Sequence, residues 1–72
     1  MAQFPVTTSR RLIAALKRLG FYEVRQKGSH LQLKRGNLLV TVPTHAGDLS
    51  LGVLRSVLRQ ARVTPQDLKE VL

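Results

Sequence analysis

Two short segments with alternating apolar and polar residues, joined by a tight turn, most constrain the fold of this chain. In residues 29–34 two leucines alternate with polar side chains, and residues 38–42 carry apolar side chains at every second position. Arg-Gly-Asn at residues 35–37 separates the two segments. Successive side chains of a strand point to opposite faces, so we expect an antiparallel hairpin with one buried face. Pro43 ends the strand at residues 38–42, because proline has no backbone N–H to donate to the ladder.

The residues around this hairpin predict one more strand and three helices. Leucine and isoleucine recur at helical spacing in residues 8–19, and Gly20 then favours a helix end. Residues 21–25 predict the first strand, and residues 51–61 predict a second amphipathic helix. Thr64 followed by proline indicates the cap and first turn of a short closing helix.

This order of elements predicts an α+β fold. A helix, three strands and a second helix build a three-stranded antiparallel sheet covered on one face by the two helices, with the short C-terminal helix appended. The opposite face of the sheet is then open to solvent and carries His30. At 72 residues, we expect a single domain that spans residues 1–72.

The charge of the chain points to a polyanionic partner. Twelve lysines and arginines face four acidic residues, a formal net charge of +8. Charge repulsion of this size in so small a domain is usually relieved by a polyanionic partner. Nucleic acid is the first candidate, an acidic protein the second and an anionic membrane the third. The absence of cysteine fits a reducing compartment, and no apolar run approaches the ~20 residues that cross a bilayer. We therefore expect a cytoplasmic protein that does not bind membranes.

The segment from Arg25 to His30 is the strongest candidate for a functional site. Histidine accepts and donates protons near neutral pH, and neighbouring cationic side chains bind phosphate oxygens. A proton-transferring group among phosphate-binding groups is the minimum needed to cut RNA, so we expect His30 to be catalytic. The alternative, a buried or idle histidine, is weakened by strand alternation that places His30 on the polar face. The expected RNA contacts are Arg25, Lys27, Gly28, Ser29, Lys34 and His45.

Three of these contacts have alternative roles. His45 is either a second proton-transfer group or phosphate donor, or a loop histidine bonded to the backbone. Gly28 allows a turn or a close approach of RNA, and Ser29 either donates to phosphate or caps the turn.

The reaction expected from these residues needs no metal or other cofactor. The four acidic residues are scattered along the sequence, and two histidines alone make a weak zinc site. The expected reaction is attack by the RNA 2′-OH on the adjacent phosphate, with His30 as general base or acid and with lysine or arginine stabilising the phosphoryl charge. DNA lacks the 2′-OH and should resist cleavage.

Three segments in a fixed order carry a resemblance to a known family. They are Gly28-Ser29-His30, Val42-Pro43-Thr44-His45 and the helical segment LGVLRSVLRQA at residues 51–61. With them, the chain resembles the HicA toxins, the small mRNA interferases of bacterial toxin–antitoxin modules, from about residue 9 to residue 68. One departure is Arg62, where the family commonly has glycine after the Gln-Ala pair, and it changes how the second helix ends.

The resemblance implies a fold like that of double-stranded-RNA-binding domains and a catalytic role for His30. It also implies metal-independent cleavage of mRNA that arrests translation. The toxin would be neutralised by a HicB antitoxin that covers the active site, and the sequence does not indicate the stoichiometry of that complex. Two alternatives remain. A non-catalytic RNA-binding module would bind RNA in a salt-dependent manner without cutting it, and a basic docking surface would bind only an acidic protein.

Overall fold

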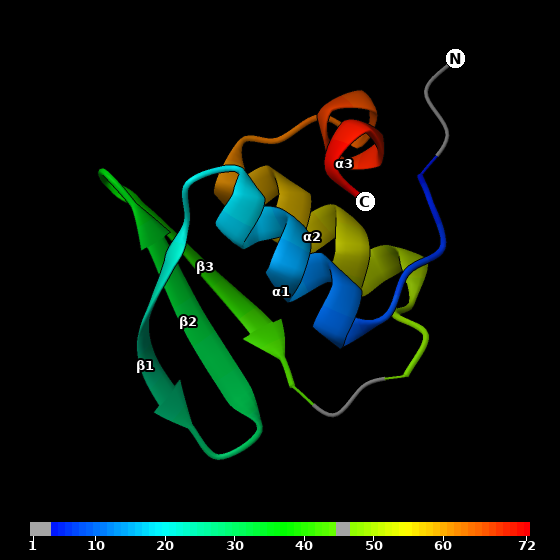
Figure 1. Ribbon diagram of the computed structural model, residues 1–72. Helices are drawn as coiled ribbons and strands as arrows, with labels where there is room; N and C mark the ends of the chain where they lie inside the picture. The colour runs from blue at the N-terminus through cyan, green and yellow to red at the C-terminus, as the bar shows by residue number, and fades with distance from the viewer. Residues whose placement is uncertain (1–3, 45–46) are drawn as a thin grey trace.

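The computed structural model describes residues 4–44 and 47–72, and it confirms the predicted α+β fold (Figure 1). The elements are α1 (Ser9–Arg18), β1 (Tyr22–Lys27), β2 (His30–Arg35), β3 (Leu38–Pro43), α2 (Leu51–Ala61) and α3 (Pro65–Val71). The predicted element order is therefore correct, and the bounds of α2 agree with the prediction. None of the helices in the described part of the chain is long and apolar enough to cross a membrane.

The first strand differs most from its prediction. We expected it over residues 21–25, but β1 begins one residue later and continues to Lys27. The reason is the two-residue turn at Gly28 and Ser29, because Gly28 takes a φ of 58° that few other residues adopt. This tight turn lets the ladder continue until Lys27 pairs with His30.

The strands form one antiparallel sheet in the order β1-β2-β3, and its register separates two faces. On one face Leu31 pairs with Val42 and Leu33 with Val40, and all four side chains are buried. The residues between them point to the other face. A bulge between Glu23 and Arg25 shifts the register of β1.

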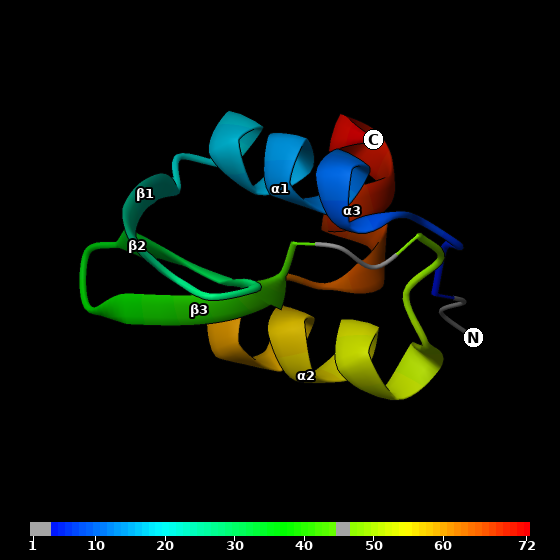
Figure 2. The ribbon, with the colours of Figure 1, turned by 90° about the horizontal axis from the view of Figure 1, so that it is seen from below.

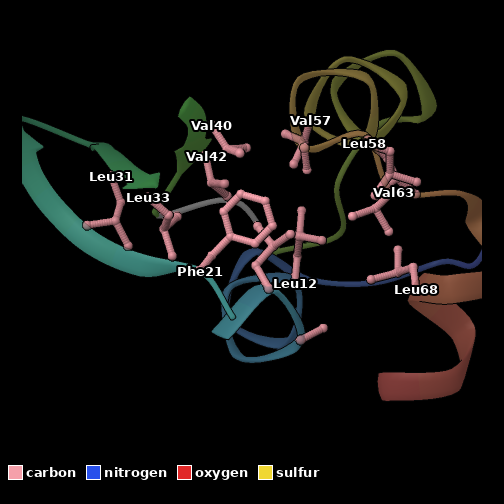
Figure 3. Close-up of a cluster of buried hydrophobic side chains, with 14 residues drawn as sticks. Leu12, Phe21, Leu31, Leu33, Val40, Val42, Val57, Leu58, Val63 and Leu68 are labelled. Carbon is pink, nitrogen blue, oxygen red and sulfur yellow. The ribbon is translucent and has the colours of Figure 1, made fainter. Parts of the chain in front are cut away.

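The core lies between the apolar face of the sheet and the helices. Figure 2 shows α1 and α2 on either side of this space, with the sheet closing one end. The leucines and valines of β2 and β3 point into it, where they meet Phe21 and the apolar stripes of both helices (Figure 3). The short α3 packs beside α1. Its Leu68 is fully buried, and Arg18 Nη1 of α1 donates to the Val71 carbonyl oxygen at 2.6 Å.

The outer edge of β3 is occupied by a side chain from α2. The backbone N–H of Thr41 donates to Gln60 Oε1 at 3.0 Å, and Gln60 Nε2 donates to Ser56 Oγ at 3.1 Å. This contact satisfies a backbone donor that an edge strand otherwise leaves to solvent. Gln60 thus fixes α2 against the sheet.

Arg62 ends α2 in a conformation that ordinarily favours glycine. Its φ and ψ are 55° and 41°, and the N–H of Val63 donates to the Leu58 carbonyl oxygen at 3.0 Å. This is a Schellman ending, in which a left-handed residue lets the last turn satisfy its carbonyl oxygens. Arg62 therefore leaves the geometry of the helix end as glycine would form it. What changes is the backbone strain, because an L residue occupies a left-handed position.

Replacing Arg62 with glycine is expected to stabilise the protein by about 0.5–1 kcal/mol, because a left-handed conformation costs a non-glycine residue roughly 1–2 kcal/mol. The melting temperature should rise by roughly 2–8 °C. The matched control is Arg59→Gly, which places the same change inside α2 and should destabilise the protein by up to ~1 kcal/mol. A lower melting temperature for Arg62→Gly would show instead that the Arg62 side chain outweighs its backbone strain.

Candidate active site

The turn between β1 and β2 places His30 at the first position of the central strand. His30 lies opposite Lys27 on β1 and opposite Pro43 on β3, and its side chain is exposed on the face of the sheet away from the core. The prediction that His30 lies on the polar face is therefore confirmed. A proton-transferring group at this position is accessible to a large substrate.

His30 shares an open hollow with cationic and polar neighbours. The residues that line this hollow are Arg25, Lys27, Gly28, Ser29, His30 and Gln32. The structure thus brings together four of the six residues predicted to contact RNA. The structure adds Gln32 to the hollow. The sequence placed Gln32 on the polar face but not in the predicted site. Its position two residues after His30 on a strand could have indicated it, because alternate residues of a strand share a face.

Of the remaining two predicted contacts, the structure describes only Lys34. Lys34 is on the same open face as His30, but four residues along β2, which corresponds to roughly 13 Å. It therefore lies outside the hollow. His45 falls outside the described residues, so its predicted role stays a prediction.

Thr44 ties the end of β3 to the turn that carries His30. Its backbone N–H donates to the Ser29 carbonyl oxygen at 2.7 Å, and its Oγ1 donates to the same oxygen at 3.0 Å. Both bonds hold the turn against the chain just beyond Pro43. Two segments that lie about fifteen residues apart in the sequence are thereby joined beside His30.

The open face of the sheet is electropositive. Arg25, Lys27 and Lys34 project from it, and none of the acidic residues in residues 4–44 and 47–72 lies on it. Glu23, the one acidic residue of the sheet, lies on the other face and forms an ion pair with Lys17 of α1. Such a surface attracts phosphate groups.

The donor set around His30 is poorly suited to a metal ion. Across the described part of the chain, no three histidine, cysteine, aspartate or glutamate side chains gather where they could hold one. The hollow offers guanidinium, ammonium and amide groups instead. Guanidinium and ammonium groups bind anions, and they have no lone pair to offer a divalent cation.

The comparison with protein families agrees with this geometry. The family model described as the HicA toxin of bacterial toxin–antitoxin systems matches residues 9–63, about three quarters of the chain. The chain belongs to the HicA toxin family. The match runs from the start of α1 to just beyond α2, so it includes the sheet and the hollow around His30. No curated protein matches the sequence.

The structure gives a physical role to each segment that resembles HicA toxins. Gly28 makes the turn before His30, and Thr44 holds that turn by bonding to Ser29. In the helical segment, Gln60 binds the edge of β3 and Ala61 is fully buried. The sequence of this helical segment resembles HicA toxins, and the structure shows that the segment holds the edge of the sheet in place.

Proposed function

We propose that this HicA family member is the toxin of a toxin–antitoxin module and acts as a ribonuclease that cleaves mRNA and arrests translation. One observation carries the proposal: an exposed histidine stands in a hollow lined by Arg25 and Lys27, on a sheet face free of acidic side chains in the described residues. The family match supports the toxin role.

In the proposed reaction His30 transfers a proton while cationic groups hold the scissile phosphate. The 2′-oxygen of one nucleotide forms a bond to the adjacent phosphorus, its proton passes to a general base, and the bond from phosphorus to the 5′-oxygen breaks. The leaving 5′-oxygen takes up a proton from a general acid. His30 serves as one of these two groups, and Arg25 and Lys27 stabilise the charge on the phosphoryl oxygens.

The backbone around His30 supports such a role. Substrate must reach an accessible histidine that is nevertheless held in place, since misplaced catalytic groups lose much of their effect. The β2 ladder fixes the position of His30, and the two bonds from Thr44 to Ser29 fix the turn before it. Thr44 is on this account a positioning residue.

We further propose that the reaction is independent of metal ions and other cofactors. The groups that line the hollow stabilise negative charge themselves, through Arg25, Lys27 and the amide of Gln32. They do the work that a divalent cation does in nucleases built from carboxylates.

The proposed regulator is a HicB-type antitoxin that covers the hollow and the basic face around it. An acidic surface on such a partner would neutralise the same cations that bind RNA. The toxin would act in the cytoplasm, where mRNA and the antitoxin meet, as a single domain spanning the chain.

The second candidate function is RNA binding without cleavage. The basic open face favours it equally, because phosphate contacts require only the cations. It differs from the first in one respect, the absence of strand scission.

Purified protein is expected to cut a single-stranded RNA in the presence of EDTA and to leave a 2′,3′-cyclic phosphate on the upstream product. Once the cut is mapped, a single 2′-deoxy substitution at that nucleotide should stop cleavage there, because the nucleophile is gone, while binding stays within a few-fold. The measurement is gel analysis of end-labelled RNA. The matched control is a 2′-deoxy substitution two nucleotides away, which should leave the cut intact.

Binding without scission of any RNA would contradict the ribonuclease and favour the binding module. Cleavage that stops in EDTA and returns with magnesium would contradict the metal-independent reaction.

A further inference from the structure

The open face of the sheet consists of three cross-strand rows set by the strand register. The row nearest the turn contains Lys27, His30 and Pro43; the middle row contains Arg25, Gln32 and Thr41; the far row contains Tyr22, Lys34 and Leu39. The first two rows supply most of the hollow described above. The far row has no role in the proposed reaction.

The far row presents two large apolar side chains to solvent. Tyr22 is 54% exposed and Leu39 is 48% exposed, one on each side of Lys34. Directly opposed side chains in a sheet have Cβ atoms ~5 Å apart, so these three form one continuous patch. An exposed aromatic ring and an exposed leucine on either side of an ammonium group form an apolar patch on a face whose other two rows are mainly polar.

The fold itself does not require a tyrosine at position 22. The preceding residue, Phe21, is the aromatic side chain of the core: it is 3% exposed and has Arg35 over its ring at 4.9 Å. Tyr22 points to the opposite face, and its hydroxyl has no hydrogen-bond partner among the described residues. Its ring is therefore free to contact a ligand.

The charge of this face selects the ligand. Lys34 within the patch and Arg25 and Lys27 beyond it make a cationic track from the patch to His30, and no acidic side chain in the described residues interrupts it. Aromatic side chains on a basic sheet bind RNA by stacking on bases that are not already stacked in a duplex. A paired base offers no free face, so the patch discriminates in favour of single strands.

We infer that Tyr22 stacks on an unpaired base of the RNA substrate at a fixed distance from the cleavage site, with Lys34 bound to a phosphate beside it and Leu39 completing the apolar surface. The inference rests on the proposed function, since it takes the RNA in the hollow as the ligand. His30 and the far row are roughly 13 Å apart along β2, so the stacked base lies to one side of the scissile phosphate. The substrate class is single-stranded RNA with an unpaired base at that offset.

An abasic scan of one RNA tests the stacking directly. In a set of oligonucleotides with one common sequence, each member lacks one base. Their affinities are measured with the His30→Ala protein, in which cleavage is slow compared with the binding measurement. For this protein, one abasic position should weaken binding roughly 5- to 150-fold, the range typical of one stacked base. In the cleavage assay with the wild-type protein, the same position should lie at a constant offset from the cut.

The tyrosine variants identify the ring that stacks. In the His30→Ala background, Tyr22→Ala should weaken binding of intact RNA by the same factor as the critical abasic position does. The double variant should then bind the intact RNA and that abasic RNA with equal affinity, because both changes remove the same contact. Tyr22→Phe keeps the ring and should behave as the parent. Leu51→Ala removes a side chain of similar exposure (51%) on α2 and is the matched control that should change nothing.

Salt dependence separates stacking from charge. Tyr22→Ala should leave the slope of log affinity against log salt unchanged, whereas Lys34→Ala should reduce it by about 0.7, the value for one phosphate of a single strand.

Two outcomes overturn the inference. The first is an RNA affinity that is unchanged in Tyr22→Ala; if neutralisation by the antitoxin is lost at the same time, the patch belongs to a protein partner. The second is a loss of RNA affinity that is independent of the abasic position. Because affinity is measured without cleavage, failure of the ribonuclease proposal leaves this result readable. If RNA does not bind at all, both proposals fall.

Discussion

Replacing His30 with alanine is expected to lower the rate of RNA cleavage by about 100- to 10,000-fold, the usual contribution of a general acid or base. The fold should be unaffected, because His30 is exposed and makes no side-chain hydrogen bond with any described residue. RNA affinity should stay within a few-fold, since Arg25 and Lys27 remain in place. The measurement is single-turnover cleavage at saturating RNA, with circular dichroism to confirm folding.

The matched control is Lys34→Ala, a change on the same strand and the same face but outside the hollow. It should weaken binding of RNA and leave the single-turnover rate at saturation nearly unchanged. Cleavage by a folded His30→Ala protein at the parent rate would remove His30 from the mechanism. Equal losses in both variants would show that the face acts through charge alone.

Replacing Leu33 with alanine is expected to destabilise the protein by about 2–5 kcal/mol, the range for a buried leucine that leaves a cavity. Leu33 is 0% exposed at the centre of the middle strand, where Figure 3 shows it directed into the core. A chain of 72 residues has a total free energy of unfolding of only about 4–11 kcal/mol. Urea titration should therefore show a variant that is close to unfolding at 37 °C.

Leu39→Ala is the matched control for this substitution. Leu39 belongs to the adjacent strand but lies on the open face, 48% exposed, so its loss should cost well under 1 kcal/mol. Equal destabilisation by the two variants would contradict the assignment of the buried face.

The hairpin of β2 and β3 shows why so much of the fold was predictable. Its register follows from alternation, since a shift by one residue would expose Leu31 and Leu33 and bury Lys34. The same alternation placed His30 on the open face. The β1 boundary was less predictable, because it depends on how tightly Gly28 turns the chain rather than on any apolar period.

Other features of the site depend on contacts between distant residues. Nothing in the sequence indicates that Thr44 bonds to the Ser29 carbonyl oxygen, or that Gln60 binds the backbone of Thr41. Both are hydrogen bonds from segments 15 to 19 residues apart, and their formation requires the sheet and α2 to be assembled first.

The sequence by itself determined the order of the elements, the buried face of the hairpin and the electropositive character of the open face. These follow from local periodicity, turn residues and net charge, which need no knowledge of distant contacts. Only the tertiary structure decided that Arg25 and Lys27 share a hollow with His30 while Lys34 lies beside Tyr22. The physical reason is the register between β1 and β2. It depends on a two-residue turn and on a bulge after Glu23, and so on how the assembled sheet pairs rather than on the residue types alone.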